Sequence, residues 1–551
     1  MIRASVFPAC ALAIILTAAG PAPAAAQHQH GSGPLTASVP MFSGLGSVHH
    51  VVGTRSARTQ ALFDQGLRLC YAFNHDEAIR SFREGARIDS GCAMCWWGIA
   101  LAYGPNINLP MGPEAEQHAL EALARAQSAA KKAPAADRAY IAALAARYGE
   151  PAGESRAARD SAYAGAMRTL SRRYPKDPDA SVLFAEALMD LRPWDLYTPD
   201  GTPKPGTDEI VGILEGVVRR FPRHTGALHL YIHALEASAH PERAEDVADR
   251  LANLAPDAGH LVHMPSHIYL RVGRYDDAAA VNARAILVDR DYLRRYDVQS
   301  IYRMMYYPHN IHMRWSALCF AGRSAASAAT AKELAQAVTW DMVRQMPPME
   351  FFRAVDYFTL VRFGKWEEVL ALPAPPTDML ATTGIWHYAR GLALAAAARS
   401  AEAAAEQDSV ATIAARLPGD AYYGLNPARP LIEFAAVLLD GEIAGRSGRT
   451  DDAVRLLSQA VAMQDALHYD EPPPWYSTAR QSLGAVLLSA GRPRDAAEVY
   501  REDLKRYPEN GWSLFGLAEA VKASGEASGP AMERFKKAWV KADIVLSESR
   551  Y

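Results

Sequence analysis

The chain of 551 residues lacks several features that would assign it to a familiar class. Its five cysteines are too few for a dense disulfide framework, and its formal net charge of −3 gives no electrostatic reason to bind nucleic acid. Beyond the N-terminus, no apolar run reaches the roughly 18 residues that a membrane-spanning helix needs. A glycine-rich phosphate loop, a Gly-x-Ser-x-Gly nucleophile motif and convincing strand-like alternation are also missing.

The N-terminus predicts export. Arg3, the apolar run 9–19 and the small residues 24–26 are typical of a cleavable signal peptide over residues 1–26. A periplasmic or secreted location follows, with no transmembrane segment in the mature chain. We expect a flexible N-terminal segment over 27–58. Abundant alanine and short runs of β-branched residues favour helices in the remainder.

Removal of the signal peptide leaves four cysteines. Cys92 and Cys95 are two residues apart, but Trp96 follows them in place of the histidine of a haem-attachment motif. In an oxidising compartment we predict a disulfide of Cys92 or Cys95 with Cys70. A redox-active pair or metal ligation is the alternative.

The chain contains internal repeats. The turn and helix start at 273–278 recur in related form at 73–78, 448–453 and 491–496, and Ala244 and Ala278 are 34 residues apart. On these motifs the chain resembles the tetratricopeptide-repeat (TPR) family, in its secreted bacterial type with histidine-rich central repeats. The resemblance implies an all-α solenoid of helix-turn-helix repeats wound into a superhelix with a concave groove, where a peptide or protein partner is expected. We expect N-terminal repeats at 59–222, central repeats at 223–325 and C-terminal repeats at 326–551.

Histidines recur in register in three consecutive central repeats. Two of them lie four residues apart in the first repeat, and the same pair returns 34 residues later. The family resemblance places these positions on the groove face. The set consists of His229, His233, His260, His263, His267, His309 and His312.

This pattern predicts a metal site. Residues four apart share one helix face, and neighbouring helices about 8–10 Å apart bring their imidazoles within reach of one ion. A ligand set of nitrogens favours a transition metal, namely zinc, copper or iron, over calcium or magnesium. The pattern leaves the identity of the metal open.

Neighbouring residues extend the predicted site. Glu236, one turn beyond His233, is a candidate ligand or orienting partner. Met264 favours copper slightly, and Cys319 faces the groove in the repeat register. Pro265 either starts a helix or kinks one beside the histidines.

Two irregular segments flank the histidine repeats. The loop at 193–208 offers Trp194 and Asp195, and the insert before His309 offers Tyr306 and Tyr307, as residues that cover or line a pocket.

Three functions fit the sequence. The leading one is an exported repeat protein that binds a transition metal through the histidines. The alternatives are a periplasmic metalloenzyme, oxidative or hydrolytic, at the same site, and a metal-free scaffold for protein–protein interaction. The sequence assigns no catalytic residue.

Overall fold

The structure is a computed structural model that describes residues 39–148, 155–298 and 300–551, so the predicted signal peptide lies outside the described residues. The described chain is helical almost throughout, which confirms the predicted all-α repeat fold. Within these ranges the single sheet is a two-stranded one, pairing Tyr422 with Pro427 and Tyr423 with Asn426. No helix of the described chain combines the length and the apolar character needed to cross a bilayer.

The helices group into two compact units. The first unit is Met1–Pro265 with Leu287–Tyr302, and the second is Ser266–Ile286 with Arg303–Tyr551. This boundary runs through the central repeats predicted at 223–325, so the predicted histidine set is divided between the units. His229, His233, His260 and His263 belong to the first unit, and His267, His309 and His312 belong to the second.

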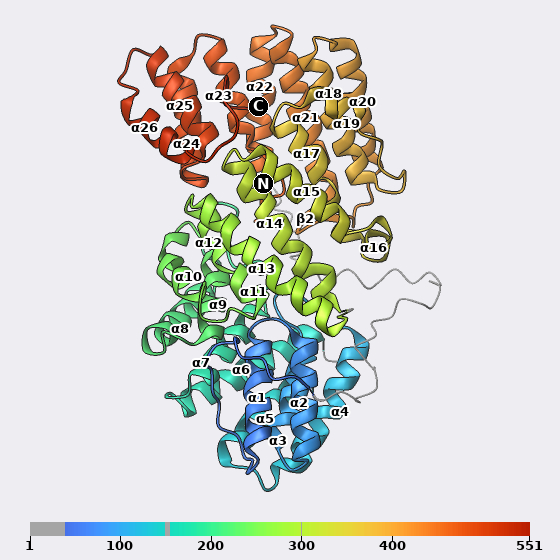
Figure 1. The fold of residues 1–551 in the computed structure, drawn as a ribbon, viewed down its shortest axis with the longest axis vertical. Helices are drawn as coiled ribbons and strands as arrows, with labels where there is room; N and C mark the ends of the chain where they lie inside the picture. The colour runs from blue at the N-terminus through green and yellow to red at the C-terminus, as the bar shows by residue number, and fades with distance from the viewer. Residues whose placement is uncertain (1–38, 149–154, 299) are drawn as a thin grey trace, which may run out of the picture. The chain divides into compact units, whose positions relative to one another are not determined.

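The first unit is built from consecutive helices, coloured blue to green in Figure 1. They are α1 (Ala57–Cys70), α2 (His75–Ile88), α3 (Ala93–Ala102), α4 (Pro113–Ala130), α5 (Ala135–Tyr148), α6 (Arg156–Arg173), α7 (Pro178–Met189), α8 (Thr207–Arg220), α9 (Thr225–Leu235), the 3-10 helix η1 (Pro241–Ala244), α10 (Glu245–Leu251) and α11 (Gly259–His263). The last part of α13 (Tyr275–Tyr296) also belongs to this unit.

The second unit continues the pattern. It contains most of α12 (Pro265–Arg271), the first part of α13, most of the π-helix η2 (Tyr302–Tyr306), α14 (Tyr307–Phe320), α15 (Ser324–Ala337), α16 (Trp340–Gln345), the 3-10 helix η3 (Pro347–Arg353), α17 (Val355–Arg362), α18 (Trp366–Ala371), α19 (Leu380–Ala396), α20 (Ser400–Arg416), β1 (Tyr422–Tyr423), β2 (Asn426–Pro427), α21 (Ala428–Arg446), α22 (Thr450–Asp465), α23 (Ala479–Ser489), α24 (Pro493–Arg506), α25 (Gly511–Ala523) and α26 (Gly529–Ala538).

Turns within the repeats use left-handed backbone. Gly273, Gly448 and Gly491 have φ values of 82°, 74° and 71°, a conformation that costs glycine little. Phe73 stands at the corresponding place of an earlier repeat with φ 53°, and Ala398 does so with φ 58°. The turn of the repeat therefore requires the left-handed conformation whichever residue stands there. It is unfavourable at Phe73 and Ala398 because they carry a Cβ atom.

The break between α11 and α12 settles how Pro265 is accommodated. One helix ends at His263, and the next begins at Pro265, which leaves Met264 as a single turn residue. Proline fits the first position of a helix because the amide that it lacks has no intrahelical partner there. The proline thus starts a new helix immediately after the one that carries His260.

Part of the segment predicted to be flexible is in fact packed. Of residues 27–58, the stretch 39–56 lies against the first unit with Leu45, Val48 and Val52 buried. The backbone amide of Gly44 donates to Asp257 at 3.0 Å, and that of Gly53 donates to Asp137 at 2.8 Å. The burial of these apolar side chains explains why the stretch is ordered.

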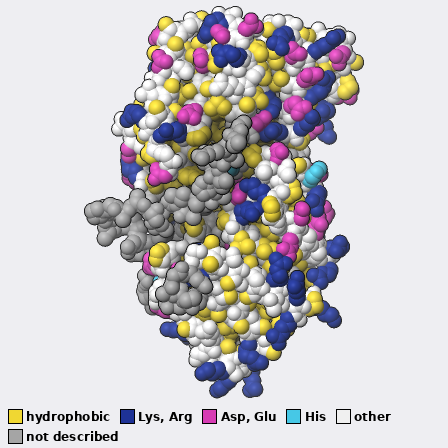
Figure 2. Space-filling model, turned by 180° about the vertical axis from the view of Figure 1, so that it is seen from behind, with side chains coloured by type: hydrophobic (Ala, Val, Ile, Leu, Met, Phe, Trp, Pro, Cys, Tyr) yellow, Lys and Arg dark blue, Asp and Glu magenta, His cyan; other side chains and the backbone are white. Residues whose placement is uncertain are grey.

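The visible surface is mixed in character. On the face shown in Figure 2, basic and acidic side chains are interspersed with hydrophobic ones over the upper part of the view. This agrees with the small net charge of −3.

The packing of the first three helices depends on two glycines. Figure 1 shows α1 and α2 side by side. A Cβ atom on Gly66 of α1 or on Gly98 of α3 would come within 2.5 or 2.6 Å of the ring of Phe82 on α2. The absence of these two side chains lets α1 and α3 close around Phe82.

We predict that Gly98→Ala lowers the free energy of unfolding by about 1–2 kcal/mol, because overpacking outweighs the helix propensity gained by alanine. The control is Gly165→Ala on α6, where no heavy atom lies within 4 Å of the added Cβ. That change should stabilise the protein by about 0.5–1 kcal/mol. Urea denaturation followed by circular dichroism measures both, and a stabilising Gly98→Ala would contradict the packing described.

Candidate metal centre

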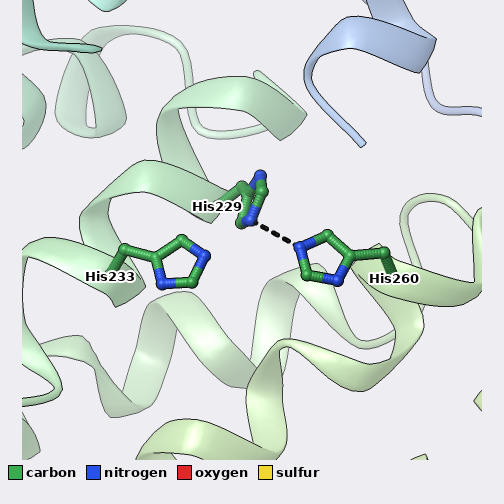
Figure 3. Close-up of side chains that lie close together, drawn as sticks. All are labelled: His229, His233 and His260. Carbon is green, nitrogen blue, oxygen red and sulfur yellow. Dashed lines mark hydrogen bonds between the residues drawn. The ribbon is translucent and has the colours of Figure 1, made fainter. Parts of the chain in front are cut away.

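Three buried imidazoles converge within the first unit. His229 and His233 lie one turn apart on α9, and His260 lies on α11. One ring nitrogen of each lies within 4.8 Å of the other two. Figure 3 shows the three rings around a common space, with Nε2 of His229 3.1 Å from Nε2 of His260. No more than 5% of any of the three residues is exposed.

Hydrogen bonds fix which nitrogens of His229 and His233 face this space. Nδ1 of His229 lies 2.7 Å from the carbonyl oxygen of Tyr71. Nδ1 of His233 lies 2.7 Å from Oε1 of Glu236. Both oxygens are acceptors, so each Nδ1 carries the proton and each neutral ring has its lone pair on Nε2. This is the tautomer that a metal ligand requires, and Glu236 therefore lies where an orienting partner would rather than at the centre.

His260 is positioned through its backbone. Its amide donates to the hydroxyl of Tyr302 at 3.1 Å, and that hydroxyl donates to Asp289 at 2.8 Å. A Cβ atom on Gly259 would lie 1.8 Å from an Asp289 carboxylate oxygen, so only glycine allows this carboxylate to approach the start of α11.

The separations are close to those of a metal site. Two nitrogens each about 2.0–2.1 Å from a tetrahedral ion lie about 3.3 Å apart. Nε2 of His260 donates a hydrogen bond to Nε2 of His229 at 3.1 Å, a separation close to this value, and the ligand nitrogens of the trio all lie within 4.8 Å of one another. Side-chain rotations that move the ring nitrogens by about an ångström would bring all three within bonding distance of one ion.

Two aromatic residues pack against the three histidines. The ring centroid of Phe73 lies 4.5 Å from that of His229, 5.9 Å from that of His233 and 5.4 Å from that of His260. The ring of Trp194 meets His233 edge-on at 5.5 Å. Both residues have left-handed backbone, with φ 53° and 57°. At Phe73 this conformation is that of the repeat turn, and at both residues it accompanies the contact of an aromatic ring with the imidazoles.

A small pocket opens beside His233 and Glu236. Trp194, Leu196 and Tyr197 of the predicted loop at 193–208 line it. The hydroxyl of Tyr197 donates to the carbonyl oxygen of Ala234 at 2.7 Å, which ties the loop to α9. The loop thus lies over His233, with Trp194 in contact with its ring. Asp195 instead pairs with Lys204.

The other predicted residues of this unit lie around the trio. His263 is buried on α11, its ring stacked against that of His260 with centroids 5.6 Å apart. Met264 is buried in the break after α11. The three cysteines Cys70, Cys92 and Cys95 are free, buried thiols, and the disulfide among them stays a prediction.

The predicted residues of the second unit form other contacts. The ring of His267 lies 5.7 Å from that of His309, and Nδ1 of His267 pairs with Glu471. Cys319 is buried and hydrogen-bonded to Ser327 at 3.0 Å. No grouping of metal ligands in the described ranges includes His312. Tyr306 is buried in η2 and Tyr307 packs against the core of the second unit.

Sequence reasoning missed the residues that orient the histidines. Tyr71, whose carbonyl accepts from His229, also donates its hydroxyl to Asp179 at 2.7 Å. Nδ1 of His50 lies 2.9 Å from the same carboxylate, and Nε2 of His224 lies 3.0 Å from it. One feature of the sequence could have pointed to this region: Phe73 is a bulky residue at a turn position where other repeats have glycine.

The hydrogen bonds of Asp179 with His50, His224 and Tyr71 make the stability of this region depend on pH. Burial opposes ionisation of Asp179, but hydrogen bonds from His224 and His50 hold its pKa well below the usual range. Burial alone would lower the pKa of His50, yet the hydrogen bond and the charge of Asp179 raise it above its ordinary value. The buried ion pair between His50 and Asp179 therefore helps to hold Tyr71, whose hydroxyl donates to Asp179 and whose carbonyl oxygen accepts from His229.

Comparisons with known proteins add no function. No protein-family model and no curated protein sequence matches the chain. The structure of the human IFIT1 dimer with m7Gppp-AAAA aligns with a TM-score of 0.32 and 13% identity, over 89% of this chain and 91% of the other. The TPR domain of P58(IPK) aligns with a TM-score of 0.22 and 10% identity, over 85% and 99%. Naa15/Naa10 bound to HypK-THB gives 0.23 and 13%, over 89% and 64%. Scores this low carry no argument, and the repeat fold rests on the chain's own helices.

We predict that Asp179→Asn destabilises the protein most near pH 5.5. The lowered pKa of Asp179 contributes stability above about pH 3.9, and the raised pKa of His50 contributes it below about pH 6.5. Breaking this buried pair should cost about 3 kcal/mol in that window and less at pH 9, because the contribution of His50 is lost as the pH rises.

Urea denaturation at the two pH values measures this difference. The control is Glu209→Gln, which removes an exposed ion pair with Arg168 and should have a smaller effect at both. An Asp179→Asn effect that is the same at both pH values would show that the charge of His50 is not involved.

Proposed function

We propose that the first unit binds one transition-metal ion through Nε2 of His229 and His233 and a ring nitrogen of His260. The observation that carries this proposal is the fixed tautomer of the α9 pair. Each of its imidazoles presents a lone pair to the common space because its other nitrogen donates to an oxygen. A set of neutral imidazoles suits zinc, copper or iron.

The balance of charge supports a fourth, anionic ligand. Three neutral imidazoles leave the charge of a divalent ion uncompensated, and Glu236 supplies one negative charge through His233. A buried site with excess positive charge is unfavourable unless an anion balances it. Hydroxide or a small anion at the fourth position would supply the missing charge.

A metal-dependent enzyme is the second candidate, favoured by the pocket beside His233. Three protein ligands with an open fourth position are the arrangement of catalytic zinc sites, whereas structural sites use four protein ligands. His233 and Glu236 both line this pocket, so a small molecule bound there would lie on the His233 side of the trio. Metal-bound hydroxide there would be the nucleophile in a hydrolytic reaction.

We predict that the purified full-length chain, freed of metal and titrated with zinc or copper, takes up about one equivalent at this centre. His229→Gln combined with His260→Gln should abolish this stoichiometric binding, since only one ligand of the trio remains. His312→Gln, a matched buried histidine of the second unit, should leave it unchanged. Metal content by mass spectrometry and affinity by calorimetry measure the effect, with circular dichroism to confirm folding.

The same titration separates the alternatives. Full binding by the His229→Gln/His260→Gln variant would place the metal elsewhere, and the absence of any uptake by the unaltered chain would reject the metal site. Glu236→Gln keeps all three ligands, so a loss of about 10–100-fold in affinity is expected there rather than a loss of the site.

The enzyme candidate makes a separate prediction. Cobalt(II) substituted for the native ion should give a visible spectrum that azide changes, because azide enters the open fourth position. Trp194→Ala should speed the spectral change by unblocking the pocket. A cobalt spectrum insensitive to azide would indicate a closed, structural site.

A further inference from the structure

The second unit contains a pocket that has no part in the metal centre. Five segments of the chain meet there. His312 and Trp315 come from α14, Phe351 from η3, Phe358 from α17 and Tyr423 from β1, and the loop after α22 closes it. The pocket is small and partly open to solvent.

Aromatic rings form most of its wall. His312 stacks on Trp315 with ring centroids 5.4 Å apart and lies 5.4 Å from Phe351. Phe351 meets Tyr423 edge-on at 6.1 Å. Faces and edges of this kind bind apolar groups and attract cations through the ring quadrupoles.

Two polar atoms in this wall are buried without a hydrogen-bond partner. They are Nδ1 of His312 and the hydroxyl of Tyr423, judged over residues 39–148, 155–298 and 300–551. Only 7% of His312 and 3% of Tyr423 is exposed. A buried polar group left unbonded costs about 1–3 kcal/mol, so two in one pocket point to a polar ligand that completes them.

The charge of the pocket favours a cation. Asp470 and Glu471 are its charged lining residues, and none of the described residues lining it is Lys or Arg. Glu471 is held by the hydroxyl of Tyr469 at 2.7 Å and by His267. Asp470 accepts only from neutral groups, among them the amide of Leu425 at 2.9 Å, and has no ion-pair partner in the described chain.

The protonation states agree with this charge. Burial lowers the pKa of His312 to about 3, so at neutral pH the imidazole is uncharged and does not repel a cation. Burial also raises the pKa of Asp470 to about 7, so this carboxyl is only partly ionised at neutral pH, and a bound cation would favour its ionised form.

From this geometry we propose that the pocket binds a small organic ammonium ion. Its charged nitrogen would lie near Asp470 and donate to His312 and Tyr423, and its hydrocarbon part would pack on Trp315 and Phe351.

The test compares three probes of one shape on the full-length chain. Phenethylammonium, 2-phenylethanol and phenylacetate are cationic, neutral and anionic. We expect calorimetry or ligand-observed NMR to show affinities that fall in that order, with phenylacetate not binding.

Tyr423→Phe removes one hydroxyl and should weaken the binding of phenethylammonium by about threefold to tenfold. Tyr422→Phe, the neighbouring residue on β1 outside the pocket lining, is the matched control and should leave the affinity unchanged.

Asp470→Asn tests the charge independently. It should abolish the preference for phenethylammonium over 2-phenylethanol while circular dichroism stays that of the unaltered chain. Equal binding of all three probes, no binding up to millimolar concentration, or binding unchanged by both Tyr423→Phe and Asp470→Asn would overturn the proposal.

Discussion

The hydrogen bond from Nδ1 of His229 to the carbonyl oxygen of Tyr71 is the contact on which the candidate centre depends. It fixes the tautomer of an imidazole that is fully buried, and it connects that imidazole to Asp179 through the other end of the same tyrosine. Because a carbonyl oxygen only accepts, Nε2 keeps its lone pair toward His260. Glu236 does the same for His233. Imidazoles oriented in this way are what a metal ligand requires, and they support the proposed site.

The fold could be predicted because the same turn and helix-start residues recur along the sequence. Glycines at the turns, such as Gly273 and Gly448, adopt the left-handed backbone that their position requires. Local chemistry left Pro265 open between a helix start and a kink, and the structure places it at the start of α12. Two features could not be predicted. The ordering of 39–56 arises from long-range contacts such as that of Gly44 with Asp257, and the division into two units arises from packing between repeats that look alike in sequence.

The centre could be predicted in part. The repeat pattern included His229, His233 and His260 in its candidate set. Register makes His263 the equivalent of His229, yet it is His260, three residues earlier, that joins the pair on α9. The pattern also included His312, which the structure places in an aromatic pocket of the other unit, since register carries no information about which repeats pack together. Tyr71 could not be found from sequence, because its contribution is a backbone oxygen that any residue type would supply. Phe73 gave a visible signal, a large side chain at a turn position usual for glycine.

X-ray absorption spectroscopy of the chain loaded with one equivalent of zinc tests the central claim most directly, since it reports the atoms around the ion. The account predicts three imidazole nitrogens at about 2.0–2.1 Å with one further light ligand and no sulfur. Scattering at about 2.3 Å from a thiolate, or a shell of oxygens without the imidazole pattern, would contradict it.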